Sequence, residues 1–302
     1  MYYIFVINGR GDYADRIKAD LNRQLAEVDI QHEFYFTEGI GDGTRFVRIY
    51  CDLHRKKEVC FIACGGSGTA NEVASGIVGF EGKSMAFLAY GATNDFTKYY
   101  DELDFTSLKK ILNGELHQID IIKANDSYSM NVINVGFDAS VAHLANRYLE
   151  QGLNGVRAFR KGLWDSLVSH RLNNIRVVAD GVRLNKRVML LCSIGNASWC
   201  GGQYRCSPKA DTEDGLMEVC LLKPMLLMDF VRMLPKYTKG TYLEDKFSLK
   251  RLEYRQAKHV ELDSKDLIYI SNDGEIVASS HFDIDILPKA LNIVLPAKKD
   301  QV

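Results

Sequence analysis

Three glycines interleaved with small hydroxyl residues follow an apolar run in the first quarter of the chain. Val59–Ala63 has the composition of a buried strand, Gly65–Thr69 carries the glycines, and a helix-like segment begins at Thr69 or Ala70. Glycine permits positive φ angles and close backbone approach, so N–H groups can crowd onto an anion that faces the positive end of the helix. The segment predicts a phosphate-binding loop, and a nucleotide phosphate is its natural ligand.

Two common phosphate-binding motifs fit this region poorly. The dinucleotide fingerprint requires a third glycine where Asn71 stands. The Walker pattern that would end at Gly82–Ser84 requires a leading glycine where Ile77 stands. A Rossmann dehydrogenase and a Walker-type ATPase are therefore disfavoured. A glycine-rich turn that only joins a strand to a helix remains the alternative.

Strands and helices alternate over residues 1–123, which predicts an α/β domain with a parallel sheet. Turn residues follow the predicted strands at Asn8, Thr37, Gly65 and Gly91. Because the carboxyl ends of parallel strands share one edge of a sheet, we expect these turns to converge on a nucleotide site. The expected strands are 2–7, 32–37, 59–63 and 84–89, and the expected helices are around 17–25, 46–54 and 71–78.

Short β-rich segments dominate the chain beyond about residue 123. Turn signals such as Asp180-Gly181 and Asp273-Gly274 separate them, and two helical stretches, 140–172 and 226–239, interrupt them. The change predicts a second, mostly antiparallel β domain over residues 124–302, whose last few residues could return to the first domain.

Composition excludes several classes of protein. The 302 residues are 46% hydrophobic with a net charge of −1, which disfavours both a disordered chain and nucleic acid as a partner. Seven cysteines without a CxxC pair indicate core thiols in a reducing compartment. The sequence offers no run of about 18 apolar residues, so we expect a cytoplasmic protein without a transmembrane segment. Peripheral contact with the inner membrane surface and assembly into a homodimer both stay open.

Six motifs occur in the order in which the diacylglycerol kinase catalytic-domain family carries them. They are Gly65–Val73, Ala89–Phe96, Asn134–Ala139, Gly195-Asn196 with Gly201-Gly202, Pro208–Leu216 and Asn272–Glu275. The chain therefore resembles this family almost end to end, in particular its soluble bacterial members, and more distantly the sphingosine kinases.

The resemblance implies an α/β fold with two domains and an active site in the cleft between them. The N-terminal domain would be Rossmann-like, with three layers as in NAD kinase and diacylglycerol kinase, and the C-terminal domain an antiparallel β-sandwich. The implied reaction is ATP- and Mg²⁺-dependent transfer of the γ-phosphoryl group to diacylglycerol or a similar lipid alcohol at a membrane surface. The residues implied to hold ATP are Asn8, Gly9, Arg10, Gly11, Asp12, Thr37, Gly65, Gly66, Ser67, Gly68, Thr69, Asn71, Glu72, Ala92, Thr93, Asn94 and Asp95.

Carboxylates near the C-terminus match the remaining family motifs. Asp273 or Glu275 is the implied base that accepts the proton of the lipid hydroxyl, and the alternative is a plain Asp-Gly hairpin turn. Asp211 and Asp214, with the backbone carbonyl of Leu216, resemble a structural Mg²⁺ site. The alternative there is an acidic turn without a metal.

The chain departs from the family pattern inside the implied active site. Ser67 replaces an acidic residue, Ala92-Thr93 replaces Thr-Gly, and Ala89 replaces proline. The backbone loop tolerates these changes, but a negative charge that could orient Mg²⁺ or the attacking hydroxyl is lost. Two further hypotheses follow: a nucleotide-binding pseudokinase with a regulatory role, and a kinase for a soluble alcohol.

A basic segment with interleaved apolar residues, Arg157–Arg176, has two interpretations. It is typical of an amphipathic helix that rests on an anionic bilayer. It is also typical of a helix that packs against the domain and exposes its charged face.

Overall fold

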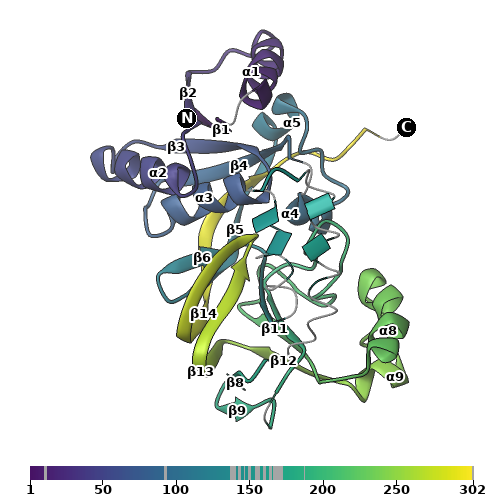
Figure 1. Cartoon of the computed structure of the whole chain (residues 1–302). Coiled ribbons are helices and arrows are strands. Elements are labelled where there is room, and N and C mark those ends of the chain that lie inside the picture. Colours follow the sequence, from purple (N-terminus) through teal and green to yellow (C-terminus); the bar gives the residue numbers. More distant parts are fainter. Residues whose placement is uncertain are drawn as a thin grey trace. The chain divides into compact units, whose positions relative to one another are not determined.

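The computed structural model of the chain describes residues 1–9, 12–91, 94–136, 141, 144–145, 147–148, 151–153, 157–158, 161–162, 165, 173–186 and 188–300. They form two compact units (Figure 1). Unit 1 comprises Met1–Ile121 and Pro288–Val302, and unit 2 comprises Ile122–Leu287. Two strands, β5 (Glu115–Ala124) and β14 (Glu275–Leu295), contribute residues to both units.

Unit 1 is built on a parallel sheet, as the alternating pattern predicts. The order of its strands is β14, β4, β3, β1, β2, and every pair in this order is parallel. The apolar runs of β1, β3 and β4 are buried almost throughout, which is typical of parallel strands covered on both faces, whereas the edge strand β2 is mostly half-buried. The bounds are β1 Tyr2–Asn8, β2 His32–Thr37, β3 Val59–Gly65 and β4 Lys83–Ala89.

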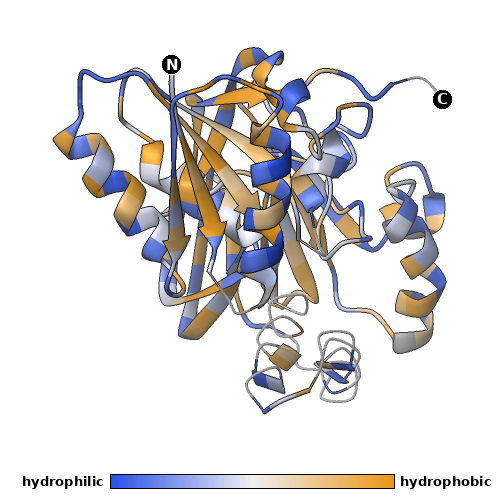
Figure 2. Ribbon diagram, turned by 90° about the horizontal axis from the view of Figure 1, so that it is seen from above, coloured by the Kyte–Doolittle hydropathy of each residue, from blue (hydrophilic) through white to orange (hydrophobic). Residues whose placement is uncertain are grey.

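Helices cover this sheet with their apolar faces. Ile17 and Leu21 of α1 pack with Phe5 and Ile62 of the sheet, and Gly76 of α3 lets α2 approach closely, because a Cβ there would lie 2.6 Å from Val47 Cβ. Figure 2 shows the strands mostly orange, whereas the helices alternate between orange and blue. The helices are α1 Asp12–Leu25, α2 Asp42–Leu53, α3 Ser67–Ile77, α4 Asp95–Tyr99 and α5 Leu108–Leu112.

Unit 2 is antiparallel, again as predicted. Its strands follow the order β12, β11, β10, β7, β13, β14, while β8 pairs with β13 and β9, and β6 pairs with β5. The bounds are β6 Ser127–Ser129, β7 Val132–Gly136, β8 Arg176–Ala179, β9 Val182–Arg183, β10 Leu191–Gly195, β11 Met217–Leu222, β12 Leu252–Ala257 and β13 His259–Asn272. Two helices, α8 Leu227–Lys239 and α9 Lys246–Leu249, lie between β11 and β12 in the chain.

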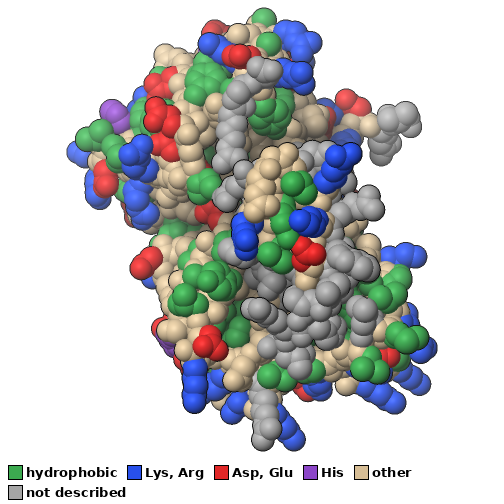
Figure 3. Space-filling view, viewed as in Figure 1, with side chains coloured by type: hydrophobic (Ala, Val, Ile, Leu, Met, Phe, Trp, Pro, Cys, Tyr) green, Lys and Arg blue, Asp and Glu red, His purple; other side chains and the backbone are tan. Residues whose placement is uncertain are grey.

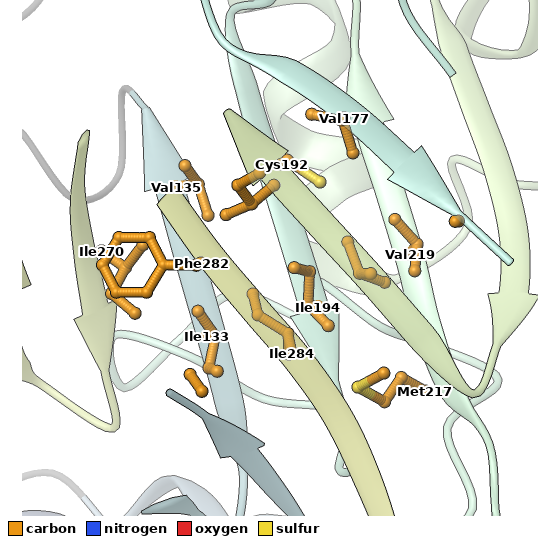
Figure 4. Packing of buried hydrophobic residues seen from close by; sticks show 14 of the residues in the cluster. Ile133, Val135, Val177, Cys192, Ile194, Met217, Val219, Ile270, Phe282 and Ile284 are labelled. Atoms are coloured by element: carbon orange, nitrogen blue, oxygen red, sulfur yellow. The ribbon is translucent and has the colours of Figure 1, made fainter. Parts of the chain in front are cut away.

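The core of unit 2 lies between its strands. Phe282 and Ile284 of β14 pack with Ile133 of β7, Ile194 of β10 and Val219 of β11, all fully buried (Figure 4). Alternate residues of each strand point into this core, which agrees with a β-sandwich-like domain.

The cysteines and helices agree with the expectations from composition. All seven cysteines are buried and free, as core thiols are expected to be. Among the residues that the structure describes, no helix is both long and apolar enough to cross a bilayer.

The position of Lys83 shows why Gly82–Ser84, the end of the Walker-like pattern, is not a phosphate site. Lys83 begins β4, at the end of the strand opposite to the turns at the carboxyl edge, and its side chain is only 2% exposed. Its ammonium group donates to the carbonyls of His54 (3.1 Å), Arg55 (3.2 Å) and Lys57 (2.6 Å), just beyond the C-terminus of α2. Cations are favourable at a helix C-terminus, so Lys83 joins α2 to the sheet.

We expect Lys83→Met to lower the free energy of unfolding by about 1–3 kcal/mol, because it leaves carbonyls without their donor. Urea unfolding followed by circular dichroism measures this. Lys56→Met, at an exposed position of the same loop, is the matched control. Equal unfolding free energies for the two variants would contradict the role of Lys83.

Candidate active site

The glycine-rich segment forms the junction of β3 and α3. Gly66 is the N-cap of α3 in an extended conformation (φ −103°, ψ −168°), and as a glycine it has no side chain with which to cap the helix. The first helical hydrogen bond runs from Ala70 N–H to Gly66 C=O (3.1 Å), so the N–H groups of Gly68 and Thr69 lie outside the helical ladder. They stand at the positive end of an 11-residue helix, where an anion is stabilised.

The helix begins at Ser67, two or three residues earlier than the start at Thr69 or Ala70 that the sequence predicts. Ser67 has a small side chain and Gly68 has none, so both join the helix without a clash. A Cβ on Gly65 would lie 2.4 Å from Thr69 Oγ1, so the turn requires glycine at this position.

The turn after β4 packs directly on this junction. The N–H groups of Tyr90 and Gly91 donate to Gly65 C=O at 3.0 and 2.8 Å. A Cβ on Gly91 would lie 2.3 Å from Gly66 Cα, so the contact is backbone against backbone. The structure thus brings two of the predicted loops together. Ala92 and Thr93 lie outside the described residues.

Ser67 links the same two loops through its side chain. Its Oγ accepts the N–H of Asp95 at 3.3 Å, where α4 begins. Asn94 lies beside this contact and donates Nδ2–H to Gly91 C=O (2.8 Å), while its Oδ1 is buried without a hydrogen-bond partner among the described residues. The serine therefore adds a side-chain hydrogen bond between the loops, but no charge.

The turns after β1 and β2 lie side by side. Asn8 and Thr37 are paired in the parallel register, and Gly9 N–H donates to Thr37 Oγ1 at 3.3 Å. A Cβ on Gly9 would lie 2.2 Å from Thr37 C=O, which explains the glycine. Arg10 and Gly11, and the side chain of Asp12, lie outside the described residues.

Glu72 is placed differently from the other residues of the loop. Its Oε1 accepts Gly41 N–H (2.9 Å) and its Oε2 accepts Gly43 N–H (2.8 Å), at the start of α2. Thr44 Oγ1 donates to the Glu72 carbonyl at 3.0 Å. Its carboxylate thus stabilises the N-terminus of α2 and holds α2 against α3. Asn71, one residue earlier, is 4% exposed.

Unit 2 contributes the second set of candidate residues, at the tip of the β13–β14 hairpin. Asp273 (φ 47°) and Gly274 (φ 96°) form a two-residue loop between the paired residues Asn272 and Glu275. Positive φ at both positions indicates a type I′ turn, for which Asp-Gly is a preferred sequence. The turn that served as the alternative interpretation is therefore present.

The Asp273 side chain has a specific environment beyond that turn. Its Oδ2 accepts N–H groups from Met130 (2.8 Å) and Asn131 (3.2 Å), and its Oδ1 accepts Val132 N–H (2.9 Å). Burial raises the pKa of Asp273 to about 6, although the hydrogen bonds from Val132, Asn131 and Met130 act in the opposite direction. The carboxyl is therefore held in one orientation, and with a pKa of about 6 it is mostly ionised at neutral pH.

Amide side chains that the sequence did not single out surround this carboxyl. Asn131 donates to Trp199 C=O (2.7 Å), Asn196 donates to Met130 C=O (3.0 Å) and Asn272 donates to Ser127 Oγ (3.1 Å). The Oδ1 atoms of Asn131 and Asn272 are buried without a hydrogen-bond partner in the part of the chain that is described. They could accept hydrogen bonds from a bound polar group. Asn196 and Asn272 lie inside two of the six family motifs. Membership of those motifs is the only signal in the sequence that could have identified them.

Asp211 and Asp214 lie on an exposed turn. Asp211 Oδ1 accepts Glu213 N–H (3.0 Å) and Asp214 Oδ1 accepts Leu216 N–H (2.9 Å), so each carboxylate bonds to the backbone two residues further on. No cluster of three or more His, Cys, Asp or Glu suited to a metal occurs in the described ranges. Two carboxylates and a carbonyl are nevertheless the oxygen donors that Mg²⁺ prefers.

Residues 3–124 match the diacylglycerol kinase catalytic domain, and residues 131–295 match the YegS C-terminal NAD kinase beta sandwich-like domain. The chain is 25% identical over 243 residues to the diacylglycerol kinase of Bacillus subtilis (strain 168), which covers 79% of this chain and 78% of that protein. It is 26% identical over 305 residues to the "Probable lipid kinase YegS-like" of Serratia proteamaculans (strain 568), covering 97% and 93%.

A solved structure of a diacylglycerol kinase from Bacillus anthracis str. Sterne has the same fold. The TM-score is 0.71 at 18% sequence identity, over 97% of this chain and 96% of that one. This likeness shows the fold, and the two family matches, which account for most of the sequence, show the family. The chain belongs to the diacylglycerol kinase catalytic-domain family of lipid kinases, with a YegS-type C-terminal domain.

Proposed function

We propose that this protein transfers the γ-phosphoryl group of ATP to the hydroxyl of diacylglycerol or a similar lipid alcohol, with Mg²⁺ as the metal. Membership of a lipid kinase family supports the reaction class. The observation that carries the proposal is the contact of Gly91 with Gly65 and Gly66, which keeps side chains away from the positive end of α3.

The nucleotide would bind along the carboxyl edge of the unit 1 sheet. N–H groups at the start of α3, Gly68 and Thr69 among them, would bind its phosphates, and the turns at Asn8 and Thr37 would complete that edge. Glu72 would act by positioning α2 and α3 rather than by touching the nucleotide. Mg²⁺, when bound with ATP, would neutralise part of the phosphate charge. Asp211, Asp214 and the Leu216 carbonyl are the proposed ligands of a second, structural ion.

In the transfer step, the hydroxyl oxygen of the lipid forms a bond to the γ-phosphorus while the bond to the β–γ bridging oxygen breaks, and ADP leaves. The hydroxyl proton passes to a carboxylate, for which Asp273 and Glu275 are the candidates. We favour Asp273, because three backbone N–H groups orient its carboxyl and its pKa of about 6 leaves it ionised at neutral pH.

Ser67 favours a second candidate function, a nucleotide-binding protein that does not transfer phosphate. The serine joins the two loops through Asp95 N–H, yet brings no negative charge to the site. Binding would then be intact and catalysis weak or absent.

Gly91→Ala is expected to weaken the binding of Mg²⁺–ATP at least about tenfold, because its Cβ would collide with the backbone of Gly66 and displace the loop. Isothermal titration calorimetry measures the Kd. Gly39→Ala, where a Cβ has no neighbour within 4 Å, is the control and should bind as the wild type does. Unchanged affinity in Gly91→Ala would argue against a nucleotide at this loop.

The rate of phosphate transfer should rise as the pH increases through about 6, because Asp273 accepts a proton only when it is ionised. In Asp273→Asn, transfer should fall about 10²- to 10⁴-fold and lose this pH dependence. Labelled ATP and diacylglycerol in mixed micelles provide the assay, and calorimetry with Mg²⁺–ATP controls for binding. A variant that keeps its rate and its pH profile would assign the base to another group, with Glu275 as the next candidate.

Ser67→Asp should raise the turnover number about 10- to 100-fold, because it adds a charge where a positioned catalytic group acts. The aspartate can still accept the N–H of Asp95. Ser67→Ala, which removes the hydroxyl without adding charge, separates the two effects. Turnover in Ser67→Asp that equals the wild type would show that this position needs no carboxylate. A wild type without turnover beside an active Ser67→Asp would favour the nucleotide-binding alternative.

A further inference from the structure

Helix α8 has an exposed apolar stripe opposite its packed face. Phe230, Met233 and Tyr237 are buried in the core of unit 2, at the spacing of one helix face. On the other side, Met228 is 84% exposed and Val231 57%. Large side chains exposed in this way next to one another commonly mark a contact surface.

Leu226 extends the stripe at the N-cap position, where a leucine side chain does not stabilise the helix. It is the N-cap of α8, 74% exposed, and it offers no side-chain hydrogen bond to the first turn. Ser, Thr, Asp and Asn are the residues that stabilise this position. An apolar residue here therefore suits contact with something outside the chain.

Positive charge surrounds the stripe. Residues 223–251 hold seven Lys or Arg against three Asp or Glu, whereas the whole chain has a net charge of −1. Two of the three carboxylates are already paired, Asp229 with Arg251 (2.8 Å) and Asp245 with Lys236. Figure 3 shows apolar and basic side chains next to one another over α8 and α9, at the right of the molecule.

Side chains of α8 and of the following segment contact one another. The guanidinium groups of Arg232 and Arg251 lie 4.3 and 3.8 Å from the centre of the Phe247 ring. Leu249, 47% exposed, adds a further apolar side chain from α9. We call this set the α8 surface; it consists of Leu226, Met228, Val231, Arg232, Lys239, Lys246, Leu249 and Lys250.

We propose that the α8 surface docks onto an anionic lipid bilayer. Its apolar side chains would enter the boundary between headgroups and acyl chains, and its Lys and Arg side chains would meet the negative headgroups. The positive charge of the α8 surface complements the negative charge of an anionic bilayer, which is why we choose this partner. The inference rests on the proposed function only for the choice of a lipid partner, and docking requires neither ATP nor transfer.

Co-sedimentation without ATP tests the proposal, with vesicles of phosphatidylcholine alone and of phosphatidylcholine with phosphatidylglycerol. The full chain should bind the anionic vesicles, and salt should weaken the binding. Met228→Ser/Val231→Ser should lower the partition coefficient at least about tenfold. Lys239→Gln/Lys246→Gln/Lys250→Gln should lower it about fivefold for each lysine.

Leu116→Ser/Leu267→Ser is the matched control, because these side chains are 60% and 61% exposed on the strands β5 and β13 and do not belong to the α8 surface. It should bind vesicles as the wild type does. Thermal melts of all variants verify that they are folded, and transfer to diacylglycerol in detergent micelles reports separately on the proposed function.

Three results would overturn the proposal. The first is binding to anionic vesicles that Met228→Ser/Val231→Ser leaves unchanged. The second is binding that is lost instead in Ile49→Ser/Leu53→Ser, since these residues form a shorter exposed stripe on α2, 54% and 74% exposed. The third is a dimer in sedimentation equilibrium that the α8 variant dissociates, which would assign the surface to a second copy of the chain.

Discussion

The backbone N–H of Gly91 donates to the carbonyl of Gly65, and this bond holds the turn after β4 against the start of α3. The contact requires glycine at position 91, since a Cβ there would lie 2.3 Å from Gly66 Cα. Gly66, the N-cap of α3, has no side chain with which to cap the helix, so the N–H groups of Gly68 and Thr69 are where we propose that an anion binds. The parallel sheet places these turns at one edge, so fold and proposed nucleotide site follow from the same arrangement.

At the β13–β14 turn, one residue also has two roles. Asp273 occupies a left-handed position that a type I′ turn requires, and its side chain accepts three N–H groups from residues 130–132. Turn geometry and side-chain orientation are thus set by one residue. Burial makes the carboxyl weaker as an acid, and a proton acceptor with a pKa near 6 suits chemistry at neutral pH. A structural role and a proposed catalytic role do not exclude one another here.

Local patterns were enough to predict the sheets but not the contacts between distant residues. The apolar run of β3 and its glycines predicted a strand, a turn and a helix, and only the start of α3 was misplaced, because Ser67 and Gly68 join the helix. Nothing local reveals that Asp273 lies beside Met130, since 143 residues separate them. The carboxylate of Glu72 on the N-terminus of α2 was missed for the same reason. The basic segment Arg157–Arg176 lies largely outside the described residues.

The central claim is that main-chain N–H groups at the start of α3 bind the phosphates of a nucleotide. Amide chemical shifts in ¹⁵N-labelled protein, titrated with Mg²⁺ and a non-hydrolysable ATP analogue, test it most directly. The account predicts that Gly68, Thr69 and Gly91 show the largest shift changes, saturating together with binding measured by calorimetry. Nucleotide binding that leaves these three amides unchanged would contradict it.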